Sequence, residues 1–140
     1  MKNTLMIVLC SSVILASGCS KSHKQDSLTL QGTWSGSEVG GNIEGSPSLI
    51  LDGTKLEFHG ANPHEWYKAT FSLREDTTPK QIEGVVTDCA FPKYVGKTFH
   101  GIYKIEDGKF TLTANKPGNP AVPASFDMKD AREFVFTLKQ

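Results

Sequence analysis

The stretch Leu49-Ile50-Leu51-Asp52-Gly53-Thr54-Lys55-Leu56-Glu57-Phe58 contains two alternating runs of apolar and polar residues around an Asp-Gly pair. A period of two is typical of a β-strand with one buried face, because successive side chains point to opposite sides. An Asp-Gly pair between such runs indicates a tight hairpin, since a type I′ turn requires two positive φ angles. The stretch therefore predicts two antiparallel strands.

The same period recurs along the chain. Alternating inward positions are Leu28, Leu30, Gly32 and Trp34; Ala69, Phe71 and Leu73; Ile82, Gly84 and Val86; Phe99, Gly101, Tyr103 and Ile105; Phe110, Leu112 and Ala114; and Phe134, Phe136 and Leu138. Asp107-Gly108 marks a second tight turn. Long loops are expected at Ser35 to Gly45 and at Lys116 to Ala131, where three prolines disfavour a central strand. A short helical turn near residues 125–132 is the alternative to an irregular loop there.

About eight sequential strands with one apolar face must hide that face in a barrel or a sandwich. We favour an all-β, up-and-down antiparallel barrel formed by residues 27–140, because closure removes exposed strand edges. Eight strands leave an interior that side chains fill or that holds one small ligand. The candidate ligand-lining residues, chosen for their shared parity, are Leu51, Phe58, Phe71, Phe99 and Tyr103.

The N-terminus has the pattern of an export signal. Lys2 precedes an apolar stretch from Leu5 to Ala16, and small residues lead into Cys19. The stretch is shorter than the roughly 20 residues that span a bilayer. A cysteine after such a site resembles the bacterial lipobox, although Ala16 stands where the usual lipobox has leucine. The alternative is an ordinary secretory signal.

This resemblance implies a cleaved signal peptide at residues 1–18 and lipid, including palmitate-type acyl chains, on Cys19. Residues 19–26 are polar and predict a flexible tether. The implied location is the cell envelope, with lipid as the membrane anchor. Ser20 follows the cysteine, which in Gram-negative lipoproteins permits transfer to the periplasmic face of the outer membrane.

Charge and cysteine content exclude several classes. Cleavage removes Lys2 from 15 basic residues and nothing from 15 acidic ones, so the mature chain carries a net charge of −1. No basic stripe appears, and nucleic acid is not an expected partner. With Cys10 removed and Cys19 lipidated, Cys89 has no disulfide partner. We expect Cys89 to be buried or inert, and the protein to be a monomer.

Gly32-Thr33-Trp34 resembles the Gly-x-Trp signature of lipocalins, in which the tryptophan plugs one barrel end and an arginine stacks across it. Arg132 is the candidate for that barrel-closing partner. More narrowly, Leu30 to Trp34 is similar to the opening of an uncharacterised bacterial lipocalin-like family of exported proteins and lipoproteins. Further similar segments are Leu49 to Phe58, Thr70 to Ile82, Gly96 to Tyr103 and Phe134 to Lys139. The resemblance implies a fold rather than an activity.

No reaction is predicted. His59, His64 and His100 lack the spacing of a zinc site, and isolated surface histidines are the default interpretation. Asp88-Cys89 matches no cysteine-hydrolase signature. We therefore expect no enzyme, metal or cofactor. The leading hypothesis is a non-catalytic module that binds a small apolar or amphipathic ligand. The alternative is a structural or protein-interaction module with a filled barrel and no ligand.

Overall fold

The computed structural model describes residues 25–140. The predicted signal peptide and Cys19 lie outside the described residues. The elements in chain order are α1 (Asp26–Thr29), β1 (Gly32–Glu38), β2 (Ser48–Asp52), β3 (Lys55–His59), β4 (Trp66–Arg74), β5 (Lys80–Cys89), the 3₁₀ turn η1 (Pro92–Tyr94), β6 (Thr98–Glu106), β7 (Lys109–Ala114) and β8 (Arg132–Leu138).

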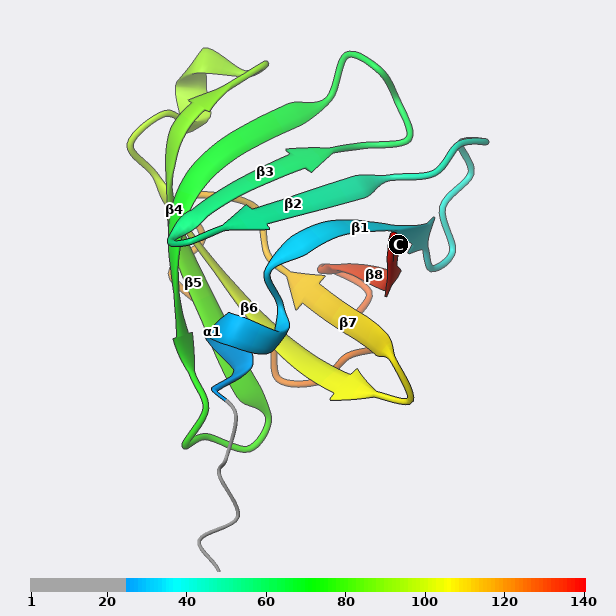
Figure 1. Cartoon of the computed structure of the whole chain (residues 1–140). Coiled ribbons are helices and arrows are strands. Elements are labelled where there is room, and N and C mark those ends of the chain that lie inside the picture. Colours follow the sequence, from blue (N-terminus) through cyan, green and yellow to red (C-terminus); the bar gives the residue numbers. More distant parts are fainter. Residues whose placement is uncertain (1–24) are drawn as a thin grey trace, which may run out of the picture.

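The eight strands form one closed antiparallel barrel in which each strand pairs with its neighbours in sequence (Figure 1). β8 returns to pair with β1, from Trp34 opposite Leu138 to Glu38 opposite Phe134. The predicted all-β, up-and-down architecture is therefore confirmed. Closure leaves no free strand edge along the sheet, so the apolar faces enclose a common interior.

Close backbone contact at the β1–β8 seam requires a glycine. A Cβ on Gly36 would collide with the carbonyl oxygen of Val135. Because the strand opposite cannot withdraw without breaking the seam, Gly36 allows β1 and β8 to approach each other.

The two predicted tight turns differ in type. Asp52 pairs with Lys55, so Gly53 and Thr54 form the loop, and Gly53 alone has positive φ, at 61°. This corrects the type I′ expectation, since glycine at the first central position is the type II′ pattern. The Asp107-Gly108 turn has positive φ at both residues, 53° and 73°, as type I′ requires.

The first strand begins later than its alternation suggests. Residues 26–29 form the short helix α1, and Leu28 is 62 % exposed rather than inward. Leu30 is fully buried, and its carbonyl accepts a hydrogen bond of 2.8 Å from Trp34 Nε1. These residues form a helix instead of a strand because the helix covers the barrel end, where Asp26 accepts hydrogen bonds from Lys80 and Tyr103.

Asp26 ends the predicted tether and is buried instead of solvated. Its carboxylate oxygen Oδ2 accepts hydrogen bonds from the Tyr103 hydroxyl at 2.9 Å and from Lys80 Nζ at 2.7 Å. Its backbone N–H donates to Glu75 at 2.8 Å. These contacts fix α1 against β5 and β6, so Asp26 belongs to the folded domain instead of the predicted tether.

Aromatic side chains fill the half of the barrel beneath α1, which we call the closed half. Trp34 is 3 % exposed, and its ring centroid lies 5.7 Å from that of Phe110. Phe110 in turn contacts Tyr103 and Phe136 at centroid distances of 5.8 and 6.2 Å. Tilted and offset rings at such distances favour a dense apolar core.

The loop from residue 115 to 131 covers part of the outer sheet surface. Ile102 and Thr113 pair across β6 and β7 with outward parity, yet both are fully buried. Thr113 Oγ1 donates to the carbonyl of Phe126 at 2.9 Å, which holds the loop in place. The loop is irregular, and residues 125–132 form no helix, although the Ala131 N–H donates to the Met128 carbonyl at 3.3 Å in a single turn. No helix within residues 25–140 has the length and apolarity needed to cross a membrane.

We predict that Asp26→Ala destabilises the barrel more than Tyr103→Phe. Removing the carboxylate leaves the Tyr103 hydroxyl and Lys80 without this acceptor, at a cost of about 2–3 kcal/mol in the free energy of unfolding. Removing only the hydroxyl leaves the Lys80 contact and costs about 1 kcal/mol. Urea denaturation of both variants measures the difference. Asp52→Ala, at an exposed turn, is the control, and an equal loss in that variant would contradict the assignment.

Candidate functional site

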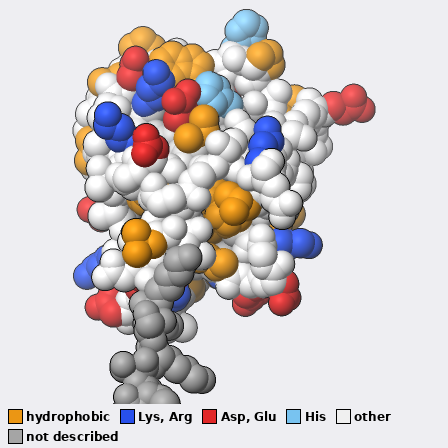
Figure 2. All heavy atoms as spheres, viewed as in Figure 1, with side chains coloured by type: hydrophobic (Ala, Val, Ile, Leu, Met, Phe, Trp, Pro, Cys, Tyr) orange, Lys and Arg blue, Asp and Glu red, His pale blue; other side chains and the backbone are white. Residues whose placement is uncertain are grey.

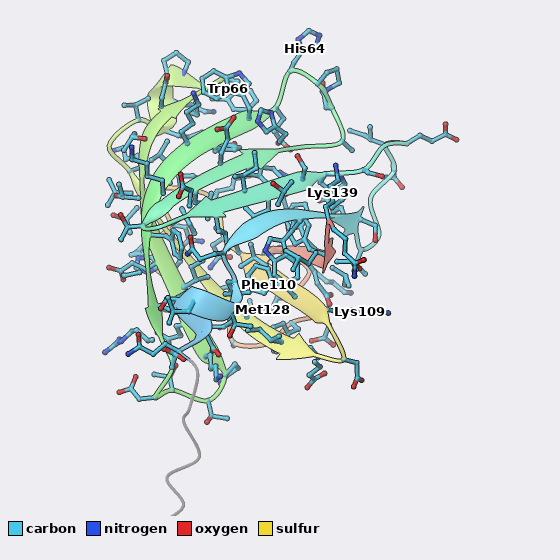
Figure 3. All side chains as sticks on the ribbon, viewed as in Figure 1. His64, Trp66, Lys109, Phe110, Met128 and Lys139 are labelled. Carbon is cyan, nitrogen blue, oxygen red and sulfur yellow. The ribbon has the colours of Figure 1, made fainter. Side chains whose placement is uncertain are left out.

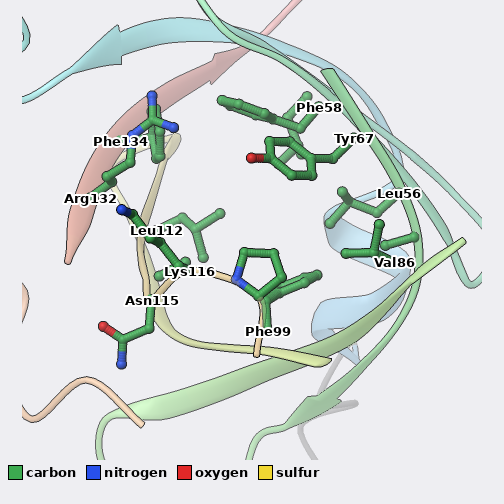
Figure 4. Close-up of a pocket in the computed structure, with 14 residues that line it drawn as sticks. Leu56, Phe58, Tyr67, Val86, Phe99, Leu112, Asn115, Lys116, Arg132 and Phe134 are labelled. Carbon is green, nitrogen blue, oxygen red and sulfur yellow. The ribbon is translucent and has the colours of Figure 1, made fainter. Parts of the chain in front are cut away.

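A cavity opens at the end of the barrel opposite α1 (Figure 4). The volume that the centre of a water molecule can occupy there is about 110 Å³, and the empty space is about 690 Å³ when the open mouth is included. A single water needs only about 10–15 Å³ on the first measure. The cavity is therefore large enough for part of an organic molecule.

The wall of the cavity is mostly apolar and comes from seven of the eight strands. The lining residues are Leu49, Leu56, Phe58, Tyr67, Ala69, Val86, Phe99, Leu112, Ala114, Asn115, Lys116, Pro117, Arg132 and Phe134. Inward residues of neighbouring strands meet here because every strand obeys the same two-residue period. The polar members of the lining offer a few directed contacts at its edge, as is usual for small-molecule sites.

The five predicted ligand-lining residues divide between two halves of the barrel. Phe58 and Phe99 line the cavity. Leu51, Phe71 and Tyr103 are buried in the core cluster but do not line it, because they lie toward the closed half. The Tyr103 hydroxyl donates a hydrogen bond to Asp26, and burial together with this hydrogen bond raises the pKa of the hydroxyl.

Tyr67 lines the cavity although it is not among the five predicted ligand-lining residues. Its hydroxyl points into the cavity between Phe58 and Leu112 (Figure 4). Burial, assisted by the nearby charge of Glu65, raises the pKa of Tyr67 to about 12. The hydroxyl therefore stays protonated at neutral pH and can donate a hydrogen bond to a ligand. Its alternation with Ala69 and Phe71 was the signal that would have identified it.

Arg132 lies at the cavity edge and does not close the other end. Trp34 pairs with Leu138, six residues beyond Arg132 on β8, which corresponds to roughly 20 Å along the strand. The expected stacking of Arg132 on Trp34 is therefore wrong. The guanidinium instead lies 5.0 Å from the centre of the Phe134 ring, and the carbonyl of Leu30, the residue after α1, accepts the hydrogen bond of the Trp34 indole.

Two carboxylates hold the Arg132 guanidinium. Glu38 accepts hydrogen bonds from Nε at 2.8 Å and Nη2 at 2.9 Å, and Glu65 accepts from Nη1 at 2.9 Å and Nη2 at 3.0 Å. The hydrogen bond from Arg132 lowers the pKa of Glu38, and the Glu38 hydrogen bond is the main cause that raises the pKa of Arg132. This Glu38–Arg132–Glu65 cluster joins β1, β8 and the loop before β4, and thereby fixes the mouth.

The histidines and Cys89 do not form a common site. His59 contacts Glu57 at 2.7 Å, and His100 lies 3.6 Å from Glu83. His64 projects at the edge of the molecule (Figure 3). Within residues 25–140 there is no group of three or more His, Cys, Asp or Glu residues that could hold a metal. Cys89 is buried as expected, and its thiol contacts the Phe91 carbonyl at 2.9 Å.

The fold and site together define a closed eight-stranded antiparallel barrel with one covered end and an apolar cavity at the other. No protein-family model, curated protein or solved structure matches the chain.

We predict that ionisation of the Tyr67 hydroxyl lowers the free energy of unfolding at alkaline pH. Because its folded pKa of about 12 exceeds the unfolded value of about 10, the folded state retains the proton more strongly. The contribution is fully present below pH about 10 and is lost as the pH rises toward 12. Urea unfolding between pH 8 and 12 should show a shallower alkaline decline in Tyr67→Phe. Identical profiles in the parent and variant would exclude this role.

Proposed function

We propose that this protein is a lipocalin-like, lipid-anchored binding module of the cell envelope whose cavity takes one small apolar or amphipathic molecule without chemical conversion. The observation that carries the ligand part is the open apolar cavity within an otherwise filled barrel. An eight-stranded barrel has room for one small ligand. The lipocalin-like assignment derives from the resemblance of the Gly32-Thr33-Trp34 opening.

The arrangement of lining groups favours an elongated amphipathic ligand. Its apolar portion would lie among Leu56 and Phe58 of β3 and Phe99 of β6. A polar portion at the mouth would meet the Tyr67 hydroxyl and the Lys116 side chain. Burial of apolar ligand surface supplies about 25 cal/mol per Å², and the polar groups fix the orientation.

The alternative function, a structural or protein-interaction module with a filled barrel, accounts for one half of the molecule only. The closed half is densely filled by Trp34, Tyr103, Phe110 and their neighbours. The other half keeps an apolar cavity, although larger lining side chains at positions such as Ala69 would fill it. This retained space favours ligand binding over a purely structural role.

Membrane attachment through Cys19 forms a separate part of the proposal. It is supported by the charged residue, apolar stretch and small residues that precede the cysteine. A Ser at position 20 favours the periplasmic face of the outer membrane in a Gram-negative cell. The described domain begins at the barrel end opposite the cavity, so such an anchor leaves the mouth accessible.

The ligand proposal predicts saturable binding of one fluorescent fatty acid per chain. Residues 25–140 would be titrated with the probe, and Ala69→Leu should weaken binding at least about tenfold by adding apolar bulk to the cavity. The matched control is Thr70→Leu, since Thr70 is exposed on the outer face of the same strand. Absence of saturable binding by the parent protein, with its fold intact, would refute the ligand proposal.

The anchoring proposal predicts that the mature chain begins at Cys19 and carries acyl groups. Intact-mass spectrometry of protein from bacterial membranes should show the loss of residues 1–18 and the addition of lipid. Cys19→Ser should abolish both changes and release the chain from the membrane fraction, because a stable anchor of this kind requires acyl chains. The unlipidated parent chain, cleaved at another position, would point to an ordinary secretory signal.

A further inference from the structure

The loop between β5 and β6, residues 90–97, exposes apolar and basic side chains together. Phe91 is 38 % exposed and Val95 is 46 % exposed. Lys93 and Lys97 belong to the same loop, which contains no Asp or Glu. Exposed apolar groups cost free energy in water, and their combination with lysine is typical of segments that contact a lipid surface.

The 90–97 loop has a defined shape and is continuous with the cavity wall. The rings of Tyr67, Phe91 and Tyr94 form a triangle with centroid distances of 6.1, 6.2 and 6.1 Å. Tyr67 lines the cavity, whereas Phe91 faces solvent. The loop therefore presents a preformed aromatic edge directly beside the mouth.

The lysines near this edge are available to an anionic surface. Within residues 25–140, neither Lys93 nor Lys97 nor Lys116 has an acidic partner within 4.0 Å. Lys116 lines the cavity, and Gly118 hydrogen-bonds to Thr98 at 2.9 Å, which brings the loop after β7 beside the start of β6. Glu38 and Glu65, the acidic residues at the cavity edge, are bound to Arg132 instead.

We propose that the 90–97 loop docks on the surface of a bilayer that contains anionic lipid. Phe91 and Val95 enter the boundary between headgroups and acyl chains, Tyr94 occupies the headgroup level, and the lysines face the lipid charge. An acidic protein is a poorer occupant, because eight residues offer less than the roughly 800 Å² per partner of a standard protein interface. Insertion of a loop requires only a few apolar side chains.

This contact is independent of the proposed anchoring at Cys19. η1 lies in the 90–97 loop at one end of β5, whereas α1 lies at the other end (Figure 1). Figure 2 shows hydrophobic side chains on the surface at the top of the view, the same region in which Figure 1 places η1. The docking surface thus lies beside the entrance through which an amphipathic molecule would pass between bilayer and cavity.

Trp66 provides a local probe for the test. Its carbonyl accepts a hydrogen bond of 3.1 Å from Ala90, at the start of the loop, and its side chain lies at the same end as η1 (Figure 3). Trp34, the only other tryptophan, is 3 % exposed beneath α1. Quenching of tryptophan fluorescence by brominated lipid chains therefore reports contact at the mouth, wherever else the full chain is attached.

The full chain should be mixed with vesicles of brominated phosphatidylcholine, with or without phosphatidylglycerol. We expect quenching with the anionic vesicles that decreases at high salt. The double variant Lys93→Gln with Lys97→Gln should lower the affinity for anionic vesicles about 25-fold, because each lysine near an anionic surface contributes about fivefold. The double variant Phe91→Ser with Val95→Ser should lower the same affinity at least about tenfold.

The matched control is Leu28→Ser with Leu138→Ser, which removes two similarly exposed apolar residues near the covered end. This variant should retain the parent quenching, and thermal unfolding of each variant verifies that the barrel persists. Equal quenching by neutral and anionic vesicles, equal loss in the control, or attachment of the chain without quenching would overturn the proposal. Loss of fatty-acid binding in Ala69→Leu with retained quenching would separate docking from the cavity function.

Discussion

Pairing of β8 with β1 closes the barrel. It converts a linear series of hairpins into a closed sheet, so that every strand contributes one face to a shared interior. The contact is close enough at Gly36 that a larger residue would collide with the Val135 carbonyl. Without this seam, neither the buried aromatic core nor the cavity would have an enclosing wall.

The two ends of the barrel are built differently, and this difference creates the site. Short turns and α1 lie at one end, where Trp34 and Phe110 fill the interior. Longer connections lie at the other end and leave the apolar wall open. A barrel of eight strands is narrow, so the choice between large and small inward residues decides whether a given layer is filled or hollow.

A cluster of paired charges stabilises each end, buried at Asp26 and partly exposed at Arg132. At the covered end the Asp26 carboxylate accepts hydrogen bonds from Tyr103 and Lys80. At the mouth Arg132 is held by Glu38 and Glu65 in paired hydrogen bonds. Charged groups removed from water require such partners, and the partners come from segments far apart in the chain. Both clusters therefore join elements that strand pairing alone would leave free to shift.

A period of two and tight-turn residues are local properties, so the strands, the closed all-β architecture and most inward positions follow from the amino-acid pattern. Leu28 and Leu138 are exceptions, because both are exposed. Phe58 and Phe99 were assigned to the cavity wall by the same local parity. Packing across the barrel selects which layer stays hollow and places Arg132 at the mouth instead of beside Trp34. Those outcomes depend on strand register and on how loops fold back over the sheet, and neither is encoded in neighbouring residues.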